Sequence, residues 1–178
     1  MIHRGTPDEE LLEALRGGDL RAFDVLYLRY ERRLFGYIRR MVVDRDLAED
    51  LMQDVVLTVL RDRSYDPQRG RFAAWLFTVA RNRCLQHERH AAVRERPVPE
   101  PRPAAADPEA AVDRHHRVRT AMAGLTDAQQ QLLLLKQVGE LTYREIADIH
   151  GVAEGTIKSR LHAATKAFRR RLAEIGGG

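Results

Sequence analysis

The sequence predicts an all-α fold made of two small helical domains, and three observations support this prediction. Apolar residues recur at helical spacing through most of the 178 residues, whereas the alternating runs typical of strands are nearly absent. Five prolines lie between residues 97 and 108, where no apolar stripe continues. Residues 139–171 have the pattern of a helix, a glycine turn and a basic second helix, which is a helix-turn-helix.

The proline-rich stretch sets the domain boundaries that we expect. Proline at this density cannot continue a helix and favours an extended, semi-rigid path. We therefore expect an N-terminal domain over residues 9–92, a Pro-rich linker over 93–112, and a C-terminal domain over 113–173 that contains the helix-turn-helix.

Four helices are expected in the N-terminal domain, over residues 8–17, 20–43, 46–63 and 72–90. The inward face of the first is formed by Leu11, Leu12 and Leu15. The second helix has a longer inward stripe: Phe23, Leu26, Tyr27, Tyr30, Leu34, Tyr37 and Ile38. A loop is predicted over residues 64–71, because this segment contains Asp-Pro and a glycine.

The third predicted helix has an acidic face. Its core side is lined by Leu47, Leu51, Val55 and Val59. Polar residues gather on roughly the opposite side: Asp46, Glu49, Asp50, Gln53 and Asp54. A charge run on a helix is commonly no more than a solvated surface. Leu57 lies within this acidic arc, however, which favours a docking face for a basic partner that also makes an apolar contact.

The fourth predicted helix combines aromatic rings with cations and amides. Its rings are Phe72, Trp75 and Phe77. Its polar groups, with the loop residue before it, are Arg71, Arg81, Asn82, Arg83, Gln86, His87, Arg89 and His90. Unstacked bases pack on rings while phosphates pair with cations, so this combination favours single-stranded or partly melted nucleic acid. The alternative is that the three rings belong to the core.

The helix-turn-helix carries a capping box and a basic second helix. Thr142 and Glu145 form the box at a helix start, and Gly151 ends that helix at a tight turn. In the second helix Ile157, Leu161, Ala164 and Phe168 recur at helical spacing. Polar residues point elsewhere, among them Lys158, Ser159, His162 and Lys166. A helix that packs with one face and offers cations and hydroxyls on another suits a DNA major groove.

Charge and cysteine content agree with this interpretation. The formal net charge is +4, and residues 113–178 carry all of it, with eleven Lys or Arg against seven Asp or Glu. An excess concentrated around the helix-turn-helix favours a polyanionic partner. The single cysteine excludes an internal disulfide, and the N-terminus has no apolar core of the kind a signal peptide needs. We therefore expect a soluble cytoplasmic protein that does not contact the membrane.

Two separated blocks of the sequence resemble one family. Residues 48–54 (Ala-Glu-Asp-Leu-Met-Gln-Asp) and 72–82 resemble the polymerase-binding and promoter-melting regions of bacterial sigma factors of the sigma-70 family, extracytoplasmic-function (ECF) group. Residues 125–172, with Thr-Tyr-Arg-Glu-Ile-Ala at 142–147 and Gly-Thr-Ile-Lys-Ser-Arg-Leu at 155–161, resemble the C-terminal domain of that group. The matches cover nearly all of the chain outside the linker and the termini.

The resemblance implies a sigma subunit that is not an enzyme and needs no cofactor or metal ion. Its partners would be core RNA polymerase, through the large clamp-bearing subunit and the flap, and promoter DNA. An anti-sigma factor is a further possible partner, and the free protein would be a monomer. The residues that the resemblance assigns to polymerase binding are Glu49, Asp50, Gln53, Asp54 and Leu57.

The resemblance also divides the promoter contacts between the two domains. The first domain would melt the minus-ten element, with Asn82 and the loop from Tyr65 to Arg71 capturing a flipped base. The residues expected at the minus-ten element are Tyr65, Arg71, Phe72, Trp75, Arg81, Asn82, Arg83, Gln86 and His87. Those expected at the minus-thirty-five element are Thr142, Tyr143, Thr156, Lys158, Ser159, Arg160, His162 and Lys166.

Two residues depart from the family pattern at the start of the second helix of the helix-turn-helix. Ala153 stands where the family usually has a capping residue, and alanine at an N-cap typically costs about 0.5–2 kcal/mol. Glu154 follows, which suits the helix dipole but repels a nearby phosphate. We therefore expect this domain to read DNA weakly by itself.

Two other classes of protein remain open from the residues alone. A dimeric helix-turn-helix regulator would need an exposed dimer seam, and no leucine-rich seam stands out beyond the expected cores. A metal or redox site could use Cys84, His87 and His90, which recur every three residues along one helix. Cys84, however, lies on a partly apolar face one turn after Ala80, as expected for a core residue.

Overall fold

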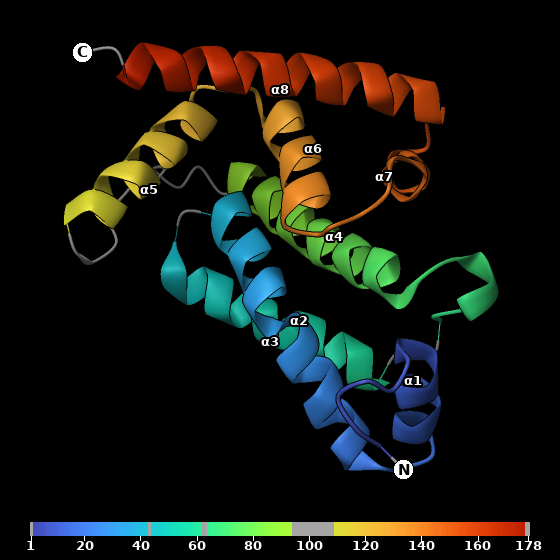
Figure 1. Cartoon of the computed structure of the whole chain (residues 1–178). Helices are drawn as coiled ribbons and strands as arrows, with labels where there is room; N and C mark the ends of the chain where they lie inside the picture. Colours follow the sequence, from blue (N-terminus) through green and yellow to red (C-terminus); the bar gives the residue numbers. More distant parts are fainter. Residues whose placement is uncertain (1, 43, 62–63, 94–108, 177–178) are drawn as a thin grey trace. The chain divides into compact units, whose positions relative to one another are not determined.

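The computed structural model describes residues 2–42, 44–61, 64–93 and 109–176, and the chain divides into two compact units, Met1–Pro99 and Glu100–Gly178. In the described ranges all regular structure is helical, comprising α1 to α8 and one short 3-10 helix (Figure 1). The prediction of an all-α fold is confirmed. Of the expected linker 93–112, residues 94–108 lie outside the described ranges, while 109–112 already belong to α5.

Unit 1 contains α1 (Asp8–Arg16), α2 (Leu20–Met41), α3 (Arg45–Arg61), the 3-10 helix (Pro67–Arg69) and α4 (Phe72–Val93). Carboxylates fix two of the helix starts. The Asp19 side chain accepts a hydrogen bond from the Arg21 amide at the start of α2, and the Asp44 side chain accepts from the amides of Asp46 and Leu47 at the start of α3. Such bonds satisfy backbone donors that have no partner within the helix.

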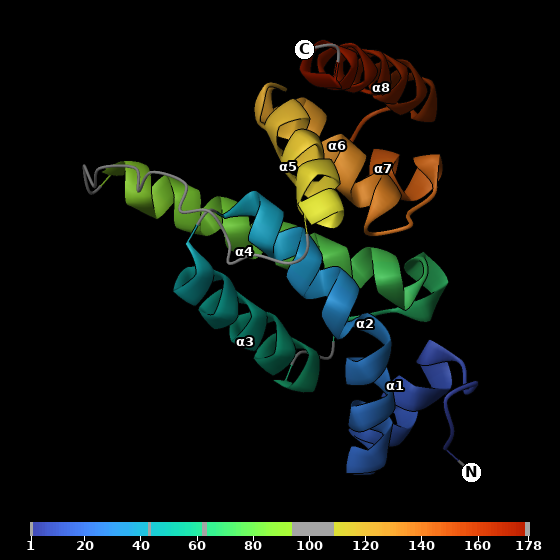
Figure 2. The ribbon, with the colours of Figure 1, turned by 60° about the vertical axis from the view of Figure 1, so that its left-hand side comes forward.

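The core of unit 1 forms around α2, which packs against α1, α3 and α4 (Figure 2). Its buried members include Leu26, Tyr37, Ile38, Val55 and Phe77. Two residues of the expected inward stripe are exceptions, because Phe23 is only half-buried and Tyr27 is 38% exposed. Leu15 of α1 is likewise half-buried. The core therefore contains fewer residues than the sequence predicted to face inward.

Unit 2 contains α5 (Glu109–Ala123), α6 (Asp127–Gln137), α7 (Tyr143–His150) and α8 (Glu154–Gly176). The long helix α8 packs against the other three. Complete capping boxes start α6, through Thr126 and Gln129, and α7, through Thr142 and Glu145. Gly151 ends α7 with φ of 63°, a left-handed conformation that favours glycine. The predicted box and glycine turn are therefore present.

None of the described helices is both long enough and apolar enough to cross a membrane.

Candidate polymerase and nucleic-acid interfaces

The acidic face of α3 lies on the surface of unit 1. The side chains of Glu49, Asp50, Gln53 and Asp54 are exposed, and Leu57 beside them is 41% exposed. Glu49 is paired with Arg45, with 2.9 Å between Oε1 and Nε. Among the residues that the structure describes, the carboxylates of Asp50 and Asp54 form no ion pair, so this face keeps uncompensated negative charge.

A groove that the sequence did not predict borders this acidic face. It lies between α2 and α3 and is lined by Tyr27, Glu31, Arg32, Phe35, Glu49, Met52 and Gln53. Tyr27 was expected inside the core, but its ring lies at the edge of this groove. The period of the apolar stripe cannot distinguish a core position from the wall of a groove, because both lie on the same side of the helix.

The aromatic residues around the loop before α4 form one cluster. Phe72 makes edge-on contacts with the rings of Tyr30 and Tyr65, at centroid distances of 5.5 and 5.6 Å. Trp75 lies against both Tyr65 and Phe72, and it is the half-buried member. Phe72 is 1% exposed and Tyr65 is 5% exposed. The expectation that the Phe72 ring packs on DNA bases is therefore corrected, because other rings already cover it, and Phe77 is fully buried as well.

The polar residues of α4 differ in how far they are available. Asn82 and Gln86 are exposed, one turn apart, whereas Arg81, Arg83 and His87 are half-buried. Arg83 donates from Nη2 to the Thr58 hydroxyl over 3.2 Å, which ties α4 to α3. Arg71 is exposed just before the helix begins. Of the α4 residues expected at the minus-ten element, Asn82 and Gln86 are thus the exposed ones.

The polar residues at the start of α7 are held by contacts within unit 2. The Thr142 hydroxyl lies 2.9 Å from a carboxylate oxygen of Glu145, and it accepts from the Glu145 amide. The Tyr143 ring is 39% exposed, with Lys136 Nζ at 4.7 Å and Lys158 Nζ at 5.8 Å from its centroid. These distances are typical of cation–π contacts. Thr142 therefore serves the helix start, and Tyr143 helps to hold Lys158.

The polar face of α8 is open to solvent. Its side chains are exposed at Lys158, Ser159, Arg160, His162 and Lys166, whereas Thr156 is half-buried. Ile157, Leu161 and Ala164 form the buried face, as the sequence predicts. The face is not uniformly basic, because Lys158 Nζ lies 2.8 Å from the Glu154 carboxylate.

This ion pair affects the pKa of Lys158. The hydrogen bond to Glu154, and then its negative charge, raise the pKa of Lys158 above its ordinary value, so the ammonium stays charged at neutral pH.

The start of α8 lacks a side-chain cap. The Ala153 carbonyl accepts from the amides of Thr156 and Ile157 at 2.9 and 3.3 Å, so the helix begins there. A methyl group cannot accept a bond from the first amides of the helix. The helix end therefore presents backbone donors together with the carboxylate of Glu154.

The residues considered for a metal or redox site are not placed for that role. Cys84 is fully buried, His87 is half-buried and His90 is exposed. No three His, Cys, Asp or Glu side chains of the described ranges are grouped to hold a metal ion. Burial raises the pKa of the Cys84 thiol to about 12, so it remains protonated and unreactive at neutral pH.

Two sequence families match the two units. Residues 26–93 match Sigma-70 region 2, and residues 115–168 match Sigma-70 region 4. The first range contains the acidic face and α4, and the second contains α6, α7 and the first part of α8 up to residue 168.

Curated relatives agree over nearly the whole chain. The RNA polymerase sigma factor CarQ of Myxococcus xanthus is 32% identical over 171 residues, which are 92% of this chain and 97% of that protein. The ECF RNA polymerase sigma factor SigK of Mycolicibacterium vanbaalenii is also 32% identical, over 91% of this chain and 87% of that protein.

Solved structures share the fold. The sigma factor RpoE of Bartonella quintana, in a complex with the anti-sigma factor NepR, has a TM-score of 0.66 and 26% identity, over 86% of this chain and 95% of that one. CnrH, in a complex with the cytosolic domain of CnrY, has a TM-score of 0.70 over 94% of this chain and 97% of that one; at 21% identity it supports the fold alone.

Together, the two helical units and their charged surfaces define a DNA-binding protein of transcription. The chain belongs to the sigma-70 family of RNA polymerase sigma factors, in its extracytoplasmic-function group. It accordingly directs promoter-specific initiation by RNA polymerase.

Proposed function

We propose that the acidic face of α3 and the groove beside it form the polymerase-binding surface of this sigma factor. The observation that carries the proposal is the exposed, uncompensated charge of Asp50 and Asp54, next to the apolar surface of Leu57 and Tyr27. A basic helical partner would neutralise the carboxylates and cover the apolar side chains. The large clamp-bearing subunit of the polymerase is the partner that the family resemblance implies for this surface.

Complementary charge at this surface would govern both the rate and the specificity of docking. Unlike charges steer two proteins together, while like charges facing one another cost several kcal/mol. The partly exposed side chains of Leu57 and Tyr27 add the apolar contact that an interface core needs. Unit 2 would contact the flap of the same polymerase, which would place both units on one enzyme.

Promoter melting is assigned to the loop before α4 and to the exposed side of that helix. Asn82 and Gln86 offer amide donors and acceptors that suit the edge of an extruded base. Trp75, which is half-buried, offers the ring surface that the cluster leaves available. Arg71 and Arg69 are exposed in the loop and would pair with phosphates. Capture of the base would drive melting, and the polymerase would carry out the chemistry.

Recognition of the minus-thirty-five element is assigned to α8. Lys158, Arg160 and Lys166 are exposed cations that would contact phosphates, while Ser159 and His162 would reach base edges in the major groove. Glu154 reduces the attraction at the helix start, because its carboxylate neutralises Lys158 and repels phosphate. This unit would therefore read DNA effectively only when polymerase holds the other unit on the same promoter.

Regulation by an anti-sigma factor is part of the proposal. The relative of known structure from Bartonella quintana was solved with such an inhibitor. The free chain would be a monomer in the cytoplasm. If the protein were a dimeric regulator, the acidic surface of α3 would have no binding partner.

Run-off transcription tests the proposal directly. Purified protein is mixed with core RNA polymerase and a genomic promoter library, and transcripts are sequenced. We expect transcripts that start downstream of a shared pair of promoter elements and that disappear when the protein is omitted. Binding of a stable free dimer to a palindrome, without any transcript, would contradict the proposal.

A further inference from the structure

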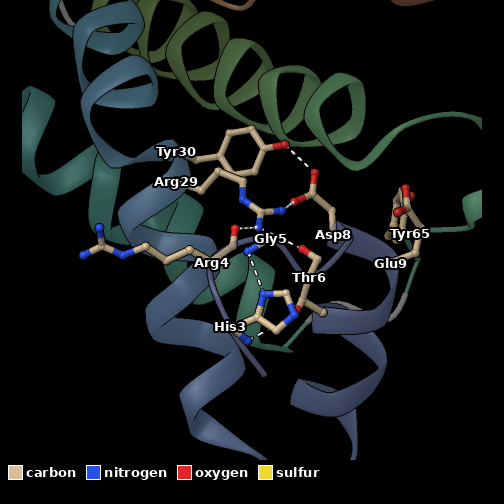
Figure 3. Close-up of polar contacts among 9 residues, drawn as sticks. All are labelled: His3, Arg4, Gly5, Thr6, Asp8, Glu9, Arg29, Tyr30 and Tyr65. Carbon is tan, nitrogen blue, oxygen red and sulfur yellow. Dashed lines mark hydrogen bonds and ion pairs between the residues drawn. The ribbon is translucent and has the colours of Figure 1, made fainter. Parts of the chain in front are cut away.

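The first helix of the chain is bonded to the loop before α4, although the two are far apart in sequence. Arg16, the last residue of α1, donates from Nη2 to the Tyr65 carbonyl over 3.0 Å. Glu9, in the first turn of α1, has its Oε1 at 3.3 Å from the Tyr65 hydroxyl. Figure 3 shows Tyr65 beside Glu9. The region 2 match begins at residue 26, so α1 lies before the part of the chain that the family match covers.

Tyr65 also closes the loop upon itself. Its hydroxyl lies 3.2 Å from the Gly70 carbonyl, so a single side chain spans the loop from its start to its end. Both neighbours of the hydroxyl are acceptors, so its one proton is shared between the loop and α1. Burial, and then the nearby Glu9 carboxylate, raise the pKa of Tyr65 to about 12, which keeps this donor protonated at neutral pH.

The backbone within the loop is ordered by further bonds. The Asp66 side chain accepts from the Gln68 amide at 2.9 Å, and the Asp66 carbonyl accepts from the Arg69 amide at 3.0 Å. Gly70 has φ of 140°, a conformation that side-chain-bearing residues rarely adopt. Residues 67–71 of the loop are therefore exposed, whereas the ring of Tyr65 at its start is buried.

The helix that holds the loop is itself fixed to α2. Asp8 pairs with Arg29 and accepts from the Tyr30 hydroxyl, and both side chains of that ion pair are largely buried (Figure 3). Arg29 also donates from Nη2 to the carbonyls of Arg4 and Thr6, at 2.7 and 2.8 Å. The N-terminal segment, α1 and α2 thus form one bonded unit, against which the loop is fastened.

We propose that Glu9 and Arg16 of α1, acting through Tyr65, are positioning residues that hold the loop over 64–71 in the conformation that reads the promoter. This inference rests on the assignment of that loop to base capture. Ordering a mobile loop on binding costs conformational entropy, and a loop that is already ordered avoids this cost. Its fixed shape also favours the base that fits and disfavours the other bases. The first helix would therefore influence promoter choice without contacting DNA.

Hydrogen exchange in the full chain tests the bonds without any DNA. Tyr65→Phe keeps the ring and removes the hydroxyl, while Arg16→Gln removes the guanidinium. The matched controls are Tyr37→Phe, whose hydroxyl is buried without a partner in the described ranges, and Arg40→Gln, whose guanidinium bonds the Gly36 carbonyl within α2. We expect the Gln68 and Arg69 amides to exchange about three- to tenfold faster in the two test variants only. Unchanged exchange would overturn the inference.

Transcription with core polymerase measures base preference at the captured position, which a merely structural role of α1 would leave unchanged. Promoters carrying each of the four bases at the captured position are compared. We expect Tyr65→Phe and Arg16→Gln to reduce the preference for the best base by about three- to tenfold, with unchanged affinity for core polymerase. A structural defect would instead lower the output of all four promoters equally. Arg16→Lys, which can still donate to the Tyr65 carbonyl, is expected to recover part of the preference.

A comparison with Asn82→Ala separates the two ways in which the inference can fail. If Asn82→Ala reduces promoter opening but the α1 variants leave base preference unchanged, base capture holds and the role of α1 is overturned. If Asn82→Ala also leaves opening and base preference unchanged, base capture itself fails, and the role of α1 in promoter reading fails with it.

Discussion

The helices α3 and α8 are built alike and charged oppositely. Each buries one apolar face and exposes a polar one, acidic in α3 and mainly basic in α8. Each also has, at its start, an ion pair between residues four apart: Arg45 with Glu49 at 2.9 Å, and Glu154 with Lys158 at 2.8 Å. In both helices, a residue of opposite charge at the helix start therefore neutralises part of the charge of the exposed face.

The difference between them lies in the remaining charges. Asp50 and Asp54 form no ion pair among the described residues, so these two carboxylates of α3 keep their negative charge uncompensated. Lys158 is held by Glu154 and lies near the Tyr143 ring of α7, so the cation nearest the start of α8 is already partly satisfied. We infer that α3 is suited to tight docking on a protein, and α8 to weaker contact with DNA that depends on the docked state.

Reversing the charge of α3 is the change with the largest expected effect. Asp50→Arg together with Asp54→Arg should weaken binding to core polymerase by about 100-fold or more, because like charges would then face each other. Fluorescence anisotropy with labelled protein measures this affinity, and circular dichroism checks that the helices remain. The control is Glu10→Arg with Glu13→Arg, two exposed acids of α1 that should change the affinity little. Unaltered affinity in the α3 variant would refute the docking assignment.

Removing a cation from α8 should have a smaller effect that is uniform across sequences. Lys158→Ala is expected to weaken DNA binding by the polymerase holoenzyme about three- to tenfold and to reduce the salt slope by about 1. Binding to the best minus-thirty-five element and to a scrambled one should weaken alike, because a phosphate contact carries no sequence information. A loss confined to one sequence would instead place Lys158 at a base edge.

Neutralising the acid at the start of α8 should strengthen DNA binding. Glu154→Gln frees Lys158 and removes a negative charge near the phosphates, so a tightening of about two- to fivefold is expected. Glu174→Gln is the matched control, since Glu174 also lies near the residue four positions before it, Arg170, but at the far end of the helix. Titration of the holoenzyme on promoter DNA measures both. Equal effects of the two variants would remove any special role for Glu154.

The corresponding change in α3 should have the smallest effect. Glu49→Gln removes one charge from the acidic face and releases Arg45, so core-polymerase affinity should fall by no more than about threefold, as exposed pairs are worth about 0–1 kcal/mol. The same anisotropy assay applies. A loss as large as that of the Asp50 and Asp54 variant would show that Glu49, although paired in the free protein, is a principal contact.

Local signals in the sequence accounted for most of the helices. The capping box of Thr142 and Glu145 and the glycine turn at Gly151 act within a few residues, so the sequence predicted them and the structure contains them. Helical spacing located most of the buried faces of α3 and α8 for the same reason, although Leu47, Val59 and Phe168 are only half-buried. The boundary near the prolines was predicted less accurately. The linker was expected to extend to residue 112, but α5 begins at Glu109, directly after Pro108. Proline is well tolerated just before or at the first turn of a helix.

The candidate sites were predicted less completely, because burial depends on distant residues. Phe72 was expected to meet DNA, but Tyr30 and Tyr65 cover its ring. Tyr27 was expected in the core, but it lies at the edge of the groove between α2 and α3. Neither outcome follows from periodicity, which identifies the side of a helix and not what lies against it.

The class of fold, the helix-turn-helix, the opposite charges of α3 and α8 and the family can all be read from the sequence, because these properties come from residue type and short-range spacing. Which rings are buried, where a groove opens, and the bonding of α1 to the loop before α4 depend instead on how the helices pack. Arg16 and Tyr65 are 49 positions apart, and Glu9 and Tyr65 are 56 apart. Contacts at that separation are made only when packing brings the helices together.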